Sequence, residues 1–126
     1  LWEKVEPMLS EHGLRPPRVL EIAEEIGLDG RATERFLARM ARAGMLARVA
    51  DNRFFLPETL LKLAQIAENM AEAAPDGSFS AGAYNKQSGL GRNLAIQLLE
   101  FFDKSGFSRR TAEGRILVAA AQEIFG

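Results

Sequence analysis

The chain repeats one pattern of apolar residues and glycines, and the two copies are displaced by 62 residues. Gly27-Leu28 corresponds to Gly89-Leu90, and Gly44 corresponds to Gly106 without any gap. Further matched pairs are Glu6 and Glu68, Met8 and Met70, Phe36 and Leu98, Met40 and Phe102, Arg48 and Arg110, and Arg53 and Arg115. Self-similarity at a fixed period indicates a repeated structural unit. We therefore predict two modules, 1–57 and 58–120, followed by a frayed helical tail, 121–126.

Each copy contains the same succession of predicted helices. A first amphipathic helix is expected over 2–11 and 60–74, because apolar residues recur there at helical spacing. A short second helix is expected over 17–26 and 81–87, and a third over 31–43 and 92–105. A glycine-bearing turn, 27–30 or 88–91, separates the last two helices, and glycine supplies the dihedral freedom that such a turn needs. This order predicts a helix-turn-helix arrangement.

A β-hairpin is expected to close each copy. The predicted strands cover 45–49 and 53–56 in the first copy, and 107–111 and 115–118 in the second. Their tips, Ala50-Asp51-Asn52 and Ala112-Glu113-Gly114, contain residues that suit tight turns. The predicted fold class is therefore mainly α with small β-hairpins, arranged as tandem winged helix-turn-helix modules.

Composition argues against several classes of function. The net charge is −1, whereas a protein that coats nucleic acid without specificity is usually basic overall. With no cysteine and one histidine, His12, we expect neither a disulfide nor a metal site. The sequence has no glycine-rich phosphate loop with a lysine and no nucleophile–base set. We therefore expect no catalytic residue, no cofactor and no enzyme activity in this chain.

The chain shows no membrane or export signal. No apolar run approaches the roughly 20 residues that span a bilayer. The N-terminus lacks a basic stretch followed by an apolar core, which a signal peptide would have. We expect a cytoplasmic monomer with no membrane partner. Because the chain opens with Leu1 and not Met, we also expect it to be part of a longer protein.

Positive charge gathers in the second copy. Between Gly77 and Val118 there are six basic residues and three acidic ones, Glu100, Asp103 and Glu113. In a winged helix the third helix and the hairpin, or wing, form the usual nucleic-acid surface. A helix start offers free backbone N–H groups to a phosphate, and arginine adds a bidentate fork. The candidate RNA-binding residues are Lys86, Gln87, Arg92, Asn93, Arg109, Arg110 and Arg115.

The third helix of the first copy also carries arginines, at positions 31, 35, 39 and 42. Their spacing makes one polar face, but Glu34 interrupts it and Glu21, Glu24 and Glu25 line the preceding helix. A solvated or salt-bridged face is the favoured interpretation. A secondary contact with RNA or the ribosome is the alternative.

Two other functions fit the same motif. A tandem winged-helix DNA-binding regulator would need dimerisation or a long basic third helix to read a major groove, and the near-neutral charge argues against it. A winged helix that binds protein needs no basic cluster and should expose an apolar patch.

The second copy resembles the last winged helix of the bacterial selenocysteine-specific elongation factor, SelB. One matching stretch is 89–103, which contains Arg92 and Leu98-Leu99-Glu100, then aromatic residues and Asp103. The other comprises Gly106-Phe107-Ser108-Arg109-Arg110-Thr111 and Gly114-Arg115-Ile116-Leu117. That family carries four winged helices in a row, so the resemblance makes the two copies the third and the fourth.

The resemblance implies a function in translation. The fourth module of the family clamps a messenger-RNA hairpin, the selenocysteine insertion element, and contacts its loop, its upper stem and an extruded base. Arg92 matches the arginine at the start of the recognition helix, and Arg109, Arg110 and Arg115 match the wing arginines. The family's N-terminal part is a GTPase that uses GTP and Mg²⁺ and carries selenocysteinyl-tRNA to the ribosome at UGA codons. This chain would tether that part to the message.

Overall fold

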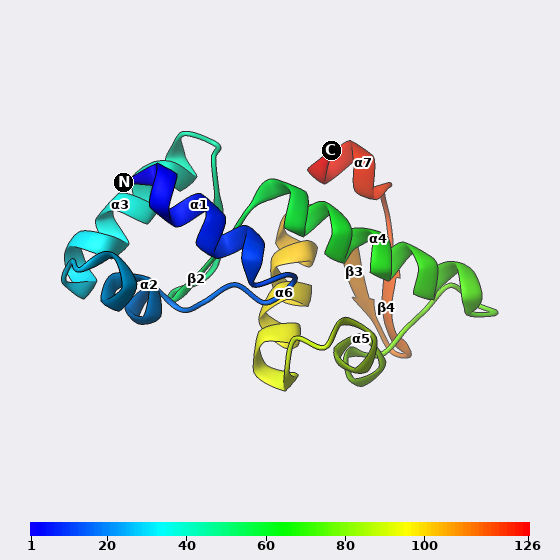
Figure 1. Cartoon of the computed structure of the whole chain (residues 1–126). Helices are drawn as coiled ribbons and strands as arrows, with labels where there is room; N and C mark the ends of the chain where they lie inside the picture. The colour runs from blue at the N-terminus through cyan, green and yellow to red at the C-terminus, as the bar shows by residue number, and fades with distance from the viewer. The chain divides into compact units, whose positions relative to one another are not determined.

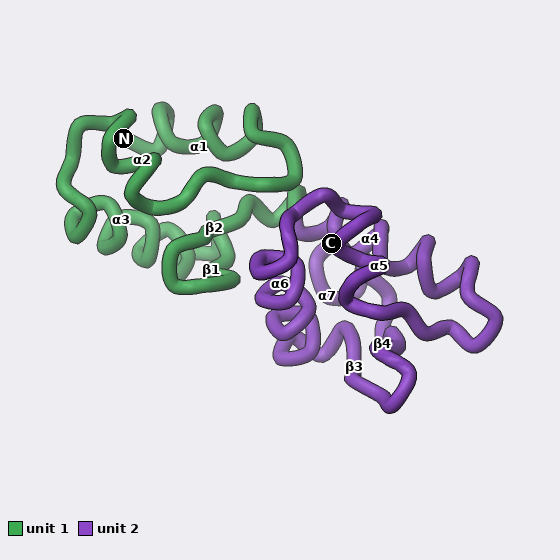
Figure 2. The backbone as a smooth tube through the Cα atoms, turned by 90° about the horizontal axis from the view of Figure 1, so that it is seen from below, with its two compact units in different colours: residues 1–59 green, residues 60–126 purple.

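The computed structural model describes residues 1–126 and divides the chain into unit 1, Leu1–Thr59, and unit 2, Leu60–Gly126 (Figure 2). Unit 1 contains α1 (Trp2–Glu11), α2 (Val19–Ile26), α3 (Gly30–Arg42), β1 (Ala47–Ala50) and β2 (Arg53–Phe55). The remaining elements are α4 (Pro57–Ala73), α5 (Ala81–Ser88), α6 (Arg92–Lys104), β3 (Ser108–Thr111), β4 (Gly114–Leu117) and α7 (Ala121–Phe125) (Figure 1). The predicted fold class, mainly helical with two small antiparallel hairpins, is confirmed. None of the helices is both long enough and apolar enough to cross a bilayer.

Glycine ends the second helix of each unit, as the turn pattern predicts. Gly27 follows α2 with φ 74° and Gly89 follows α5 with φ 71°. Both lie in the left-handed region, which glycine adopts without the steric cost of a Cβ atom. The chain therefore turns sharply at the same place in each unit and enters the third helix.

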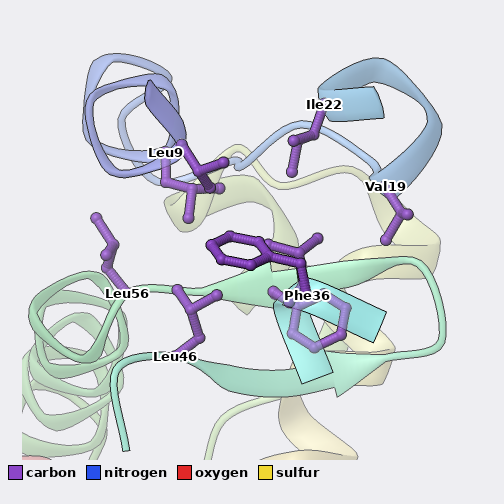
Figure 3. Packing of buried hydrophobic residues seen from close by; sticks show 9 residues of the cluster. Leu9, Val19, Ile22, Phe36, Leu46 and Leu56 are labelled. Carbon is purple, nitrogen blue, oxygen red and sulfur yellow. The ribbon is translucent and has the colours of Figure 1, made fainter. Parts of the chain in front are cut away.

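The core of unit 1 is formed by residues from all three helices and from the hairpin. The cluster includes Leu9 of α1, Val19 and Ile22 of α2, and Phe36 of α3 (Figure 3). Leu46 and Leu56, which flank the two strands, are also part of it. Burying these side chains is the main force that holds the short helices against the wing.

The core of unit 2 is richer in aromatic residues. Phe102 of α6 packs edge-on against Phe107, with their ring centroids 5.1 Å apart. Tyr84 of α5 is fully buried, and its hydroxyl donates a hydrogen bond to the Leu63 carbonyl of α4 at 2.7 Å. Burial raises the pKa of the Tyr84 phenol, so the hydroxyl remains a donor at neutral pH. This bond joins α5, the helix before α6, to α4.

Two boundaries differ from those expected. The first helix of the second copy begins at Pro57 and not near Leu60, because proline suits the first helical position, where its missing N–H costs nothing. The boundary between the units consequently falls within the first turn of α4.

The C-terminal tail is not frayed. Its last residues form α7, and Phe125 packs against Phe101, Phe102 and Phe107 with ring centroids 5.3 to 6.4 Å apart. The Ala121 backbone N–H also donates to the Glu68 carboxylate of α4 at 2.9 Å. Contacts with distant residues stabilise a five-residue helix that would not form alone.

The two wings differ in register. In unit 2 the pairs run regularly from Ser108↔Leu117 to Thr111↔Gly114, whereas the unit 1 ladder is irregular between Arg48 and Ala50. A Cβ atom at Gly114 would lie 2.4 Å from the Phe79 carbonyl oxygen, so only glycine fits there. The close approach brings the segment before α5 against β4.

Candidate nucleic-acid interface

The start of α6 presents two of the predicted residues to solvent. Arg92 and Asn93 are exposed, while Leu94 and Ala95, which follow them, are buried and hold the helix in place. The N-cap residue is Gly91, and no side chain caps the helix. Backbone N–H groups of the first turn are therefore open to an anion, beside the Arg92 guanidinium.

The end of α5 contributes the second pair of predicted residues, Lys86 and Gln87, and both are exposed. The structure does not bring Gln87 to the side on which Arg92 lies. Gln87 lines a hollow against α4, together with Ile66, Asn69, Met70 and Ala73. Lys86 does not line this hollow, and RNA contacts by either residue remain a prediction.

Next to Arg92 the structure has a pocket that the sequence pattern does not predict. It measures about 340 Å³ and is lined by Ala81, Gly82, Asn85, Arg92 and Ile96. Small residues on α5 leave the space open, and the Asn85 side chain offers a donor and an acceptor at its wall. The pocket thus lies between α5 and α6, at the side of Arg92.

The wing supplies Arg109 and Arg110, both exposed on β3. Successive side chains on a strand point to opposite faces, so these two arginines leave the ribbon on opposite sides. Arg110 pairs across the ladder with Arg115, and Arg109 with Ile116. A partner that meets both arginines must therefore approach the edge of the ribbon rather than one face.

Arg115 is a correction to the predicted site. It is 5% exposed, and its guanidinium binds the Asp103 carboxylate, with Nη2 lying 3.0 Å from Oδ2. Strand alternation alone could not tell whether Arg115 faced solvent or the body of the unit. Its repeat counterpart, Arg53, is also buried and donates to the Pro16 carbonyl. An arginine at the same position of both copies was therefore a sign of a structural role, since both side chains are buried.

The remaining cations stay available. None of Lys86, Arg92, Arg109 and Arg110 forms an ion pair, and all four are exposed. No group of three or more histidine, cysteine or acidic side chains could hold a metal ion. The candidate surface of unit 2 thus combines four unpaired cations, a helix start and a small pocket with the polar side chains of Asn85 and Arg92 at its wall.

Unit 1 places its charges differently. The four arginines of α3 are exposed, as expected, but Glu34 does not pair with them. Glu34 instead binds Arg48 of the wing at 2.8 Å. On α2, the Arg18 backbone N–H donates to the Glu21 carboxylate at 2.8 Å and holds the pKa of that carboxyl below its usual value. The unit 1 wing therefore offers no free arginine.

Comparison with known proteins shows which family the chain is similar to. The family described as elongation factor SelB, winged helix, matches residues 72–117, which lie within unit 2. The solved mRNA-binding domain of elongation factor SelB from Escherichia coli, in complex with SECIS RNA, superposes with a TM-score of 0.83. It is 30% identical, and the match covers 94% of this chain and 93% of that one.

The chain belongs to the SelB family. It is similar to the selenocysteine-specific elongation factor of Escherichia coli K12, at 30% identity over 93% of this chain. The corresponding factor of Haemophilus influenzae is 32% identical over 79% of it. The matches span 18% and 16% of those relatives, so the chain corresponds to a small part of a SelB protein. The resemblance seen in the sequence is confirmed.

Proposed function

We propose that this chain binds a messenger-RNA hairpin of the SECIS type through unit 2. The observation that carries the proposal is the joint exposure of Arg92 at the α6 start and of Arg109 and Arg110 on the wing, all without acidic partners. The Escherichia coli domain that superposes on 94% of this chain was solved with SECIS RNA. Phosphates of a hairpin tip would meet the arginines and Lys86, and Asn93 would contact a sugar or a base edge.

The pocket beside Arg92 favours RNA with an unpaired base. Sequence-specific RNA recognition uses loops and splayed bases, because the deep groove of an RNA duplex admits few side chains. We propose that a base leaves the hairpin and enters the pocket, where the Asn85 amide reads its edge and Arg92 holds the adjoining phosphate.

For the longer protein we propose the role that its relatives are named for. Selenocysteine-specific elongation factors are the two similar proteins described above. The rest of such a protein would bind GTP and Mg²⁺, act as a GTPase in the cytoplasm, and deliver selenocysteinyl-tRNA to the ribosome at UGA codons. This chain would keep that machinery on the message.

Fluorescence anisotropy with labelled nucleic acids tests the proposal. The probes are a panel of SECIS hairpins, duplex DNA of the same stem sequence, and single-stranded RNA of the same composition. We expect one or more hairpins to bind more tightly than both controls. If each of the four candidate cations contacts one phosphate, the coefficient of about 0.7 per phosphate for single strands applies. The logarithm of the binding constant should then fall with the logarithm of the salt concentration at a slope of roughly −3. Equal affinity for duplex DNA would favour the DNA regulator, and no binding to any probe would favour a protein partner.

A further inference from the structure

An ion pair between buried Arg115 and partly exposed Asp103 links the wing of unit 2 to α6. Arg115 lies on β4 and Asp103 in the last turn of α6. The guanidinium Nη2 is 3.0 Å and Nε 3.2 Å from Oδ2, and Nε is also 3.3 Å from Oδ1. Ser108, at the start of β3, donates its hydroxyl to Oδ1 at 2.5 Å. One carboxylate thus holds both strands of the wing.

Backbone hydrogen bonds fix Arg115 from a second direction. Its N–H donates to the Phe79 carbonyl at 2.9 Å, and its carbonyl accepts from the Phe79 N–H at 3.0 Å. Phe79 lies just before α5, so the Arg115 backbone joins the wing to the segment that leads into α5. Arg115 is therefore held both by its side chain, to α6, and by its backbone, to the segment before α5.

The pair also governs the surroundings of a free cation. Arg110 and Arg115 are directly opposite in the ladder, so their side chains project from the same face of the ribbon. Two like charges in that arrangement repel, and a buried guanidinium without a partner is costly. The Asp103 carboxylate neutralises Arg115 and leaves Arg110 exposed with its charge free.

Unit 1 lacks this connection. The repeat counterpart of Asp103 is Ala41, and Arg53 donates to the Pro16 carbonyl instead of to its own third helix. Both units bury an arginine of the wing, but only in unit 2 does a carboxylate on the third helix bind it. The connection is therefore not a requirement of the fold.

We propose that Asp103 and Arg115 are positioning residues for RNA binding: their ion pair sets the wing against α6 so that Arg110 and Arg92 meet one RNA together. The inference rests on the proposed function, since it concerns the same surface. Asp103 itself would touch no RNA. It acts through the wing that carries Arg110.

The sign of the effect separates this role from simple electrostatics. An acidic residue near an RNA surface repels phosphate, so its removal should tighten binding if it does nothing else. If Asp103 positions the wing, Asp103→Asn should weaken binding although it removes a negative charge. Glu100→Gln is the matched control, because Glu100 lies exposed on the same helix and loses the same charge.

The experiment measures the anisotropy of the tightest-binding SECIS hairpin with the 126-residue chain and its variants. We expect Asp103→Asn to bind roughly 5- to 10-fold more weakly than wild type. Arg115→Lys, which keeps the charge but loses the fork, should behave like Asp103→Asn. Glu100→Gln should bind as tightly as wild type or more tightly. Melting curves identify any variant that fails to fold, and Arg115→Lys then decides in place of Asp103→Asn.

A double-mutant cycle tests whether the effect passes through the wing. In an Arg110→Ala background, Asp103→Asn should change affinity by about twofold or less, because the contact being positioned is gone. A loss equal in both backgrounds would overturn the inference, as would folded Asp103→Asn and Arg115→Lys proteins that bind like wild type. If wild type binds no hairpin, the proposed function itself fails, which is a separate result.

Discussion

The two units share one frame and differ in what they leave unpaired. At the start of the third helix, unit 1 has Asp29, whose carboxylate accepts the Ala32 backbone N–H at 2.7 Å. Unit 2 has Gly91 there, and the helix start stays open. In the wing, Arg48 is neutralised by Glu34, whereas its counterpart Arg110 faces a helix with Ile96 at the corresponding position.

The difference shows that the number of arginines does not decide which unit can bind an anion. Unit 1 carries more arginine on its third helix than unit 2 does. Yet its helix start and its wing, the two parts that form the usual nucleic-acid surface, are each occupied by a carboxylate. Unit 2 has Gly91 and Ile96 at the positions of Asp29 and Glu34, so its helix start and its wing arginine have no carboxylate partner.

The largest expected effect comes from removing an exposed arginine at the α6 start or on the wing of unit 2. Arg110→Ala or Arg92→Ala should weaken hairpin binding by about 1–3 kcal/mol, as for a charged contact with RNA. Arg48→Ala and Arg39→Ala, the controls in unit 1, should change it little, since Arg48 is already neutralised and Arg39 lies over the Phe36 ring. Anisotropy titrations measure all four variants. A large loss for Arg39→Ala would move the RNA surface to unit 1 and remove the contrast drawn above.

A smaller effect is expected at the helix start of unit 1. Asp29→Ala removes the side-chain cap of α3 and should lower the free energy of unfolding of unit 1 by about 1 kcal/mol. Hairpin affinity should not change, because the capped helix start is not part of the RNA surface. Chemical denaturation measures the stability, and fluorescence anisotropy measures the hairpin affinity. Unchanged stability would mean that Asp29 does not serve as a cap, and a change in affinity would extend the RNA surface to α3.

Much of the fold could be predicted because the determinants are local and occur twice. Apolar spacing and the glycines at 27 and 89 predict the helices and turns, and a second copy of each signal confirms the first. The end of the chain could not be predicted in this way. No pattern among the residues near Phe125 predicts the α7 helix. The helix is held by the packing of Phe125 on Phe102 and Phe107, which lie far from it in the sequence.

The candidate site was predictable to the extent that exposure follows from position on a helix or strand. Arg92, Asn93, Arg109 and Arg110 are exposed where the pattern placed them. The burial of Arg115 could not be predicted, because its partner Asp103 is 12 residues away and lies on a different element. The pocket beside Arg92 arises from the packing of α5 on α6, which no single stretch of sequence encodes.

The central claim is that RNA meets the α6 start and the wing of unit 2 together. The most direct test follows the backbone amide chemical shifts of the isotope-labelled chain. A SECIS hairpin that binds in the anisotropy experiment is titrated into it. We expect the largest changes at residues 85–93 and 108–111, and small changes along α3, 30–42. Changes centred on α3, or confined to the α6 start with the wing unaffected, would contradict the account.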